Sequence, residues 1–205
     1  MKILSEEPLL PDSAFVEDPV LVLDEGAVLC RLGAPSRARE SELLQREIEG
    51  LRAVSTIKAP GTLEGGDILR VDRTLFVGLS GRTNAEGVAQ LRRLVEGWGY
   101  RVVEVAVQGC LHLKTAVTSP AAGWLVANAQ WVDLSRFQDF EIVPVPEQEP
   151  WGANTLRLND RVLVAASAPE TARRLQAKGV AVTPVDVSEL QKAEAGLTCM
   201  SVLYG

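Results

Sequence analysis

Val71-Asp72-Arg73-Thr74-Leu75-Phe76-Val77-Gly78 decides the fold, because Asn159-Asp160-Arg161-Val162-Leu163-Val164-Ala165-Ala166 repeats its pattern. Each copy is a polar turn that leads into an apolar strand, and a helix-length segment follows it. Around both copies the order strand, strand, helix, strand recurs about every 45 residues. The recurrence predicts an α/β fold, and specifically an α/β propeller of repeated ββαβ units around a pseudo-symmetry axis.

Four such units are recognisable, and we expect residues 1–205 to form a single α/β-propeller domain. A doubly wound α/β sheet is the alternative, but it needs single parallel strands joined by helices rather than a hairpin before each helix. A ring also needs its ends closed. The last predicted strand has no hairpin or helix of its own, so either a unit is absent or the closure is unusual.

The predicted elements follow from alternation, helical periodicity and turn residues. Four hairpins are expected, at Val20–Leu23 with Ala27–Arg31, Ile68–Val71 with Thr74–Val77, Leu113–Val117 with Trp124–Ala127, and Asn154–Leu158 with Val162–Ala165. Helices are expected from Ser36 to Glu49, after a capping box at Thr83–Glu86, near Asp133–Phe140, and from Ser167 to Lys178. Returning strands are expected at Val54–Ile57, Val102–Val107, Glu141–Val145 and Val180–Val185, and a last strand at Cys199–Tyr204.

Composition excludes several classes of function. The net charge is −6 and no Lys/Arg-rich block occurs, so no nucleic-acid or membrane partner is expected. Apolar runs are strand-length, and no secretory signal follows Met1. Three widely spaced cysteines indicate free thiols in a reducing compartment, so a cytoplasmic location is expected. Without a C-x-x-C or a Cys/His cluster, no metal or other cofactor is predicted.

The residues that carry chemistry are few. Glu64-Gly65-Gly66-Asp67 places two carboxylates around two glycines and then enters an apolar strand. A Glu beside such a bend can hold the ring N–H of a histidine, and His112 is the only histidine of the chain. Cys199 follows a glycine and small polar residues, which leave room for a substrate to approach its sulfur. A distant Cys and His are a candidate nucleophile and base.

Each of these residues also has an ordinary structural interpretation. Glu64 could be a solvated residue of a turn that the following Asp caps. His112 lies between two leucines and could be a hydrogen-bonded histidine of the core. Cys199 could be a buried, inert thiol, which is the commoner role of a cysteine on a strand. Cys30 and Cys110 have only this interpretation.

The segments Glu64–Asp67, Leu111–Thr115 and Thr198–Ser201 together resemble the signature segments of dimethylarginine dimethylaminohydrolase. That family belongs to the guanidine-modifying, or amidinotransferase, superfamily. Pro11–Asp18 and Gly78–Gly87 are similar to it too, so the resemblance covers nearly the whole chain in order. The family's fold is a propeller of five α/β units, which agrees with the repeat described above.

The resemblance implies hydrolysis of Nω-methylated arginine to citrulline and methylamine or dimethylamine. Cys199 would be the nucleophile, His112 the general acid and base, and Glu64 the carboxylate that orients His112. A guanidinium is a poor electrophile until its leaving amine is protonated, so an acid is required. A thiolate is required as well, and a bound cation beside the sulfur favours it.

The resemblance also implies residues that bind the substrate. Three acids would surround its guanidinium, two arginines would hold its α-carboxylate, and one backbone group would contact its amino-acid end. Without the resemblance, each arginine is an ordinary surface residue at a helix start. The implied residues are Asp12, Glu17 and Asp18 for the guanidinium, Arg37 and Arg82 for the carboxylate, and Ala193 for the backbone contact.

The sequence departs from the family's pattern in two places. Before the nucleophile the family usually has Asp-Gly-Gly, where this chain has Glu194-Ala195-Gly196, and Glu194 is longer than the Asp that contacts the substrate amine in the family. The family also carries about one further unit before Pro11–Asp18, including a mobile loop over the substrate, where Met1–Leu10 stands here. We therefore expect a propeller that lacks about one N-terminal unit, and a chain that self-associates as a homo-oligomer over the gap or is truncated.

Two other functions stay open at this point. A deiminase of arginine or another guanidine would use the same residues and differ only in small contacts to the leaving group. A catalytically inactive binding or interaction module of the same fold is the other, although Glu64, His112 and Cys199 are all present. In every case the expected partner is a small-molecule guanidine.

Overall fold

A computed structural model describes residues 2–204 and shows an α/β fold built from four small sheets. Each sheet has three strands in chain order, with the first two antiparallel and the last two parallel. The sheets are β1 (Val20–Val22), β2 (Ala27–Leu29), β3 (Val54–Thr56); β4 (Ile68–Val71), β5 (Thr74–Leu79), β6 (Arg101–Ala106); β7 (Val117–Ala121), β8 (Trp124–Ala127), β9 (Glu141–Pro144); and β10 (Leu156–Leu158), β11 (Arg161–Ala165), β12 (Ala181–Val185). The repeat predicted from the sequence is confirmed, and its arrangement is propeller-like.

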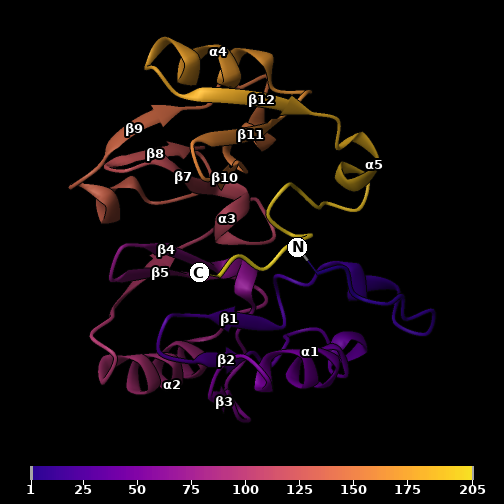
Figure 1. The fold of residues 1–205 in the computed structure, drawn as a ribbon. Helices are drawn as coiled ribbons and strands as arrows, with labels where there is room; N and C mark the ends of the chain where they lie inside the picture. Colours follow the sequence, from indigo (N-terminus) through magenta and orange to yellow (C-terminus); the bar gives the residue numbers. More distant parts are fainter. Residues whose placement is uncertain (1, 205) are drawn as a thin grey trace.

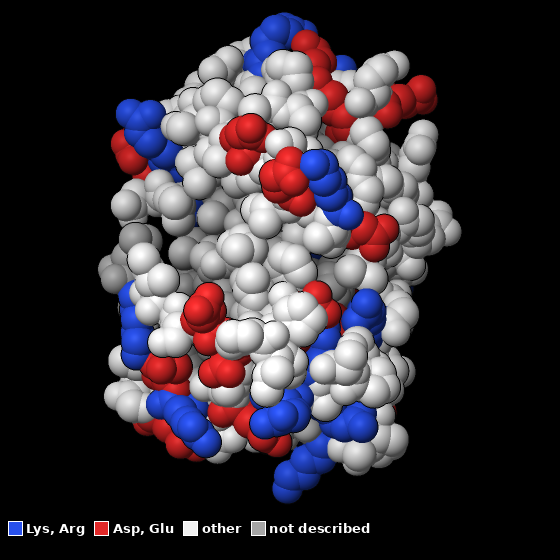
Figure 2. Space-filling model, turned by 90° about the vertical axis from the view of Figure 1, so that its right-hand side faces the viewer, with Lys and Arg blue, Asp and Glu red and all other residues white. Residues whose placement is uncertain are grey.

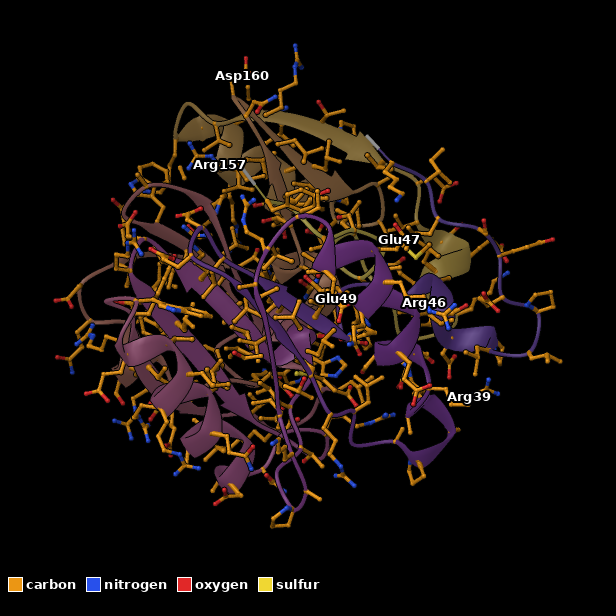
Figure 3. The ribbon with its side chains drawn as sticks, turned by 60° about the horizontal axis from the view of Figure 1, so that its bottom comes forward. Arg39, Arg46, Glu47, Glu49, Arg157 and Asp160 are labelled. Atoms are coloured by element: carbon orange, nitrogen blue, oxygen red, sulfur yellow. The ribbon has the colours of Figure 1, made fainter. Side chains whose placement is uncertain are left out.

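A helix links the second and third strands of three sheets and lies on the outside of the molecule, whereas a 3-10 turn makes this link in the third sheet (Figure 1). The linking helices are α1 (Glu40–Glu49), α2 (Ala85–Glu96) and α4 (Pro169–Ala177), and the turn is Leu134–Phe137. Along α1 the buried Leu44 and Ile48 face β2 and β3, while the exposed Arg46 and Glu49 lie on its outer side (Figure 3). This amphipathic pattern is what made the helix predictable.

The apolar core lies between consecutive sheets rather than in one central layer. Leu23 and Val28 of the first sheet pack with Val77 and with Leu91 of α2. Phe76 of β5 packs on Phe137 with ring centroids 4.7 Å apart, and further clusters join the third and fourth sheets. Each sheet therefore covers its neighbour, as in a propeller.

The first strands β1, β4, β7 and β10 face one another and line a common cavity of about 240 Å³. Short α3 (Leu113–Ala116) sits at the middle of the arrangement (Figure 1). The last helix, α5 (Ser188–Gln191), leads back from the fourth sheet toward this centre. None of the helices among residues 2–204 is long and apolar enough to span a bilayer.

Five sequence predictions were wrong in detail. The helix expected from Ser36 begins only at Glu40, after the 3-10 turn Pro35–Arg37, and the helix expected near Asp133–Phe140 is the 3-10 turn Leu134–Phe137. Leu113–Val117 was expected as a strand, but Leu113–Ala116 form one turn of helix and β7 begins only at Val117, because the Asp67 carboxylate accepts the Leu113 N–H and stabilises a turn there. Cys199–Tyr204 is a turn followed by irregular backbone, and no described strand pairs with it. The N-cap of α2 is Asn84 rather than Thr83, whose hydroxyl accepts the Glu64 N–H instead.

The face turned toward the viewer in Figure 2 carries both acidic and basic side chains near its two ends, with a largely uncharged band between them. No large field of one sign gathers on this face, which agrees with the absence of a basic block in the sequence.

Candidate active site

Glu64 and His112 form the centre of the candidate site. His112 directly precedes α3, and Glu64 directly precedes the 3-10 turn Gly65–Asp67. The Nε2 atom of His112 lies 2.6 Å from Oε2 of the fully buried Glu64. The second glycine is needed here, because a Cβ at Gly66 would lie only 2.8 Å from the imidazole ring. The predicted hydrogen bond between the glycine bend and the only histidine is confirmed.

The surroundings of His112 favour its protonated form. Burial lowers the pKa of the imidazole, but the Glu64 hydrogen bond and the charges of Asp18 and Asp67 outweigh this and raise the pKa of His112 to about 8. Burial raises the pKa of Glu64, yet His112, the Gly33 N–H and Arg82 together hold it below its usual value. The pair is therefore an imidazolium and a carboxylate near neutral pH, which suits an acid that protonates a leaving group.

Cys199 lies in the turn after α5 and is half-buried. Its sulfur accepts the Gly196 N–H at 3.4 Å, and its carbonyl accepts the Glu17 N–H at 3.2 Å. Burial, followed by the charge of Glu17, raises the pKa of the Cys199 thiol to about 11. The sulfur is therefore a thiol until a cation enters beside it. No hydrogen bond joins it directly to the imidazole in residues 2–204.

Other contacts bring the two groups to the same place. The buried Glu17 carboxylate forms an ion pair with Lys114, which is two residues after His112. It also accepts a hydrogen bond from Oγ1 of Thr198, the residue before Cys199, at 2.7 Å. The sequence analysis did not single out Lys114 or Thr198, although both lie inside the quoted motifs.

Asp18 contacts both the glycine bend and the arginine predicted to bind a carboxylate. Its Oδ1 accepts the Gly66 N–H at 3.0 Å and lies 4.0 Å from His112 Nε2. Its Oδ2 pairs with Arg37 at 2.7 Å. Asp12 lies in the 3-10 turn Pro11–Ala14, where its carbonyl accepts a hydrogen bond from Arg37 at 3.5 Å. The Asp18 carboxylate thus lies beside His112, whereas Asp12 contacts this region through its backbone carbonyl.

The two predicted arginines differ in how they are occupied. Arg37 is buried, and its guanidinium is bound by both Asp18 and Glu40, which lies 2.7 Å away. The Nη1 atom of Arg82 lies 3.6 Å from Glu64 and is buried without a hydrogen-bond partner. Arg82 therefore offers the more available donor for an incoming carboxylate.

Ala193 lies on the loop between α5 and Cys199, where its N–H donates to the Leu190 carbonyl at 2.9 Å. The following residues Glu194–Gly196 line a small hollow together with Thr115 and Asn154. This loop carries the sequence departure from the family and leads directly to the candidate nucleophile. The N–H of Ala193 is therefore already bound within this loop.

Asp67 is a further buried group that the sequence analysis treated only as part of a turn. Its Oδ1 accepts the Leu113 N–H at 2.9 Å and its Oδ2 accepts the Ser80 hydroxyl at 2.6 Å. Burial raises the pKa of Asp67. Its position directly after the double glycine was the available signal that it fixes the turn carrying His112.

Asp18, Glu64 and His112 offer ligand atoms that all lie within 4.8 Å of one another. Such a spacing could hold a cation. In this arrangement, however, the Glu64 carboxylate is bound to the imidazole and Asp18 to the Arg37 guanidinium. The charges of the three groups are thus already balanced by protein partners.

A model of the arginine deiminase family matches residues 7–120, which places this chain among the guanidine-modifying enzymes. The dimethylarginine dimethylaminohydrolase of Pseudomonas aeruginosa is 38% identical over 204 residues, covering 98% of this chain and 80% of the relative. That of Streptomyces coelicolor is 44% identical over 195 residues, covering 94% and 74%. This chain therefore belongs to the dimethylarginine dimethylaminohydrolase family.

Solved structures agree with this assignment. The Pseudomonas aeruginosa enzyme, as a Cys-to-Ser mutant complexed with citrulline, matches with a TM-score of 0.91, 38% identity, and coverage of 95% of this chain and 77% of that one. The N-terminal domain of the cyanobacterial arginine dihydrolase ArgZ matches with a TM-score of 0.87 at 20% identity, over 96% of this chain and 77% of that one. The second match shows the shared fold alone.

Proposed function

We propose that this chain hydrolyses Nω-methylated arginine to citrulline and methylamine or dimethylamine. Cys199 is the nucleophile, His112 the general acid and base, and Glu64 the carboxylate that orients His112. The observation that carries the proposal is the 2.6 Å bond between a fully buried Glu64 and an imidazole whose pKa is raised to about 8. The similarity to two dimethylarginine dimethylaminohydrolases supports it.

The proposed reaction has two steps. The Cys199 sulfur forms a bond to the guanidinium carbon while the bond from that carbon to dimethylamine breaks, and His112 gives its proton to the departing amine. A thiouronium then links Cys199 to the rest of the substrate. A water molecule gives a proton to His112 and adds to the same carbon, and the C–S bond breaks to release citrulline.

The acids of the site explain how a thiol with a pKa of about 11 becomes a nucleophile. Without substrate, burial and the charges of Glu17 and Asp18 disfavour the thiolate. A guanidinium bound beside the sulfur offsets those charges and lowers the pKa of the thiol. Asp12, Glu17 and Asp18 are proposed to hold this cation, so that deprotonation accompanies substrate binding.

The α-carboxylate of the substrate is proposed to bind Arg82 and Arg37, and the backbone at Ala193 to contact the amino-acid end. The Nη1 atom of Arg82, which has no hydrogen-bond partner and only a 3.6 Å ion pair with Glu64, supports its part. Arg37 is engaged by Asp18 and Glu40, so a carboxylate would share it with those acids. Arg82 is therefore expected to contribute more to substrate affinity.

A deiminase is the second candidate, because the family model that matches residues 7–120 is that of arginine deiminase. Turnover of arginine and of Nω,Nω-dimethylarginine under identical conditions decides between them. We expect citrulline from dimethylarginine at a kcat/KM at least tenfold above that from arginine, and none from a Cys199→Ser variant. Preference for arginine would favour the deiminase, and citrulline from neither would favour an inactive binding module.

We also propose that the chain is one domain that self-associates. Met200, Leu203 and Tyr204 are exposed on the C-terminal segment, whose backbone pairs with no described strand. Neighbouring exposed apolar side chains such as these favour contact with a second copy. Sedimentation velocity tests this, and a monomer at micromolar concentrations would contradict it.

The three free cysteines support a cytoplasmic location, which fractionation of the source cells tests.

A further inference from the structure

Asn154 lies at the centre of a ring of hydrogen bonds around the proposed nucleophile. It follows the 3-10 turn Pro150–Ala153 and precedes β10, and its side chain is almost fully buried, with 7% of the residue exposed. Neither the motifs nor the proposed reaction assigns it any part. A buried amide needs partners for both of its N–H groups and for its oxygen, so its contacts show what it organises.

All three polar positions of the amide are used. Nδ2 donates to the Lys114 carbonyl at 2.9 Å and to Oγ1 of Thr198 at 3.1 Å. Oδ1 accepts the Thr198 N–H at 3.3 Å. One side chain therefore ties the turn that carries His112, two residues before Lys114, to the turn that carries Cys199, one residue after Thr198.

Glu17 completes the ring on the other side. Its carboxylate binds Lys114 Nζ and accepts the Thr198 hydroxyl at 2.7 Å. The single hydroxyl proton of Thr198 is thus given to Glu17, which leaves its oxygen free to accept from Asn154. The ring of Asn154, Thr198, Glu17 and Lys114 joins four separate parts of the chain.

Asn154 also holds the residue that donates to the sulfur. A Cβ at Gly196 would overlap Oδ1 of Asn154, so the amide packs directly against the Gly196 backbone. The N–H of Gly196 is the donor that lies 3.4 Å from the Cys199 sulfur. A shift of Gly196 would therefore remove a group that stabilises the thiolate.

We infer that Asn154 is a positioning residue for this reaction, which fixes Cys199 relative to His112 and aims the Gly196 N–H at the sulfur. The predicted loss in kcat rests on the proposed function, whereas the hydrogen bonds that place Cys199 and Gly196 do not depend on it. Placement errors of about 1 Å can cost a factor on the order of 100 in rate. A positioning role therefore predicts a loss in kcat that exceeds any change in KM.

Asn154→Ala and Asn154→Asp test the inference, with Asn128→Ala as the matched control. Asn128 is as buried, with 6% exposed, and its amide bonds the backbone of Pro150 and Gln130 instead of the ring. Asn154→Asp keeps the shape but loses both donors, and the Thr198 hydroxyl cannot donate to the introduced carboxylate and to Glu17 at once.

Two readouts separate positioning from simple structural support. The first is kcat and KM with Nω,Nω-dimethylarginine, where both Asn154 variants should lose about 10- to 100-fold in kcat. The second is the rate of iodoacetamide alkylation at Cys199, resolved by peptide mapping across pH. Losing one charge-assisted donor should slow it about tenfold at pH 8 and move its midpoint upward. Asn128→Ala should match the wild-type chain in both readouts, whatever its melting temperature.

Wild-type alkylation and kcat in either Asn154 variant would overturn the inference, as would equal losses in Asn128→Ala. If both Asn154 variants fail to fold while Asn128→Ala folds, the residue is a structural support and the positioning role is wrong. If the wild-type chain releases no citrulline, the proposed function fails. The alkylation comparison then still decides whether Asn154 controls the sulfur.

Discussion

Replacing Glu64 by Gln removes the charge that sustains the His112 imidazolium and leaves the shape of the side chain unchanged. Glu64 is fully buried and its Oε2 lies 2.6 Å from Nε2 of His112. Without it, burial acts against the remaining charges of Asp18 and Asp67, and the pKa of His112 should fall from about 8 to about its ordinary 6.5. This difference corresponds to about 2 kcal/mol, and near pH 7.5 the protonated fraction falls from about three quarters to about one tenth.

Proton NMR measures this pKa without ambiguity, because His112 is the only histidine of the chain. The Cε1–H signal should titrate with a midpoint near 8 in the wild-type chain and more than one unit lower in Glu64→Gln. Glu149→Gln is the control, since that carboxylate accepts hydrogen bonds only from the start of α4 among the described contacts. A wild-type midpoint of 6.5 or below, or a midpoint that Glu64→Gln leaves in place, would refute the reasoning.

Three further predictions concern stability and substrate binding. Folding raises the pKa of His112 from 6.5 to about 8, so protonated His112 contributes about 2 kcal/mol to the free energy of unfolding. This contribution is complete below pH 6.5 and disappears as the pH rises through 8. Denaturant unfolding at several pH values should show the loss in the wild-type chain and not in His112→Gln. Gly65→Ala should lower the free energy of unfolding by about 2–3 kcal/mol, because its Cβ would overlap the Glu17 carbonyl. The control Gly50→Ala has open space around it, and its free energy of unfolding in the same assay should stay within about 0.5 kcal/mol of the wild-type value. Arg82→Gln should raise KM for dimethylarginine about 10- to 100-fold, with a smaller change in kcat. The control is Arg39→Gln, at an exposed position that is labelled in Figure 3. It should leave both kcat and KM unchanged in the same steady-state assays.

Much of the fold was predictable because each unit carries its signals locally. The hairpin Ile68–Val71 with Thr74–Leu79 consists of two mainly apolar runs around a two-residue turn, and α2 shows its stripe of Val88, Leu91 and Val95. The runs are apolar because both faces of this hairpin are largely buried, and the stripe marks the buried face of α2. The sequence therefore contained the strand order and the sheet count, apart from residue-level boundaries.

The errors arose where a distant group decides the local structure. Leu113–Val117 was expected as a strand, yet the carboxylate of Asp67, 46 positions earlier, accepts the Leu113 N–H and holds Leu113–Ala116 in a helical turn. Thr83 reads as a cap, but its hydroxyl is taken by Glu64. Periodicity cannot register such contacts, because they depend on how separate units meet.

The site divides in the same way. The link between Glu64 and His112 was predictable from the double glycine and from the rarity of histidine. Asn154 was not, because an Asn before a strand is an ordinary turn residue until the fold places Thr198 and Lys114 against it. Residues that position a reactive group need no motif of their own.

The covalent link to Cys199 tests the central claim most directly. The chain is mixed with Nω,Nω-dimethylarginine, quenched in acid during turnover and digested, and the peptide that contains Cys199 is weighed by mass spectrometry. We predict an adduct with the mass of the substrate less dimethylamine, found on Cys199 and absent from the peptides of Cys30 and Cys110. Citrulline release without any adduct on Cys199, or undiminished release by Cys199→Ala, would contradict the account.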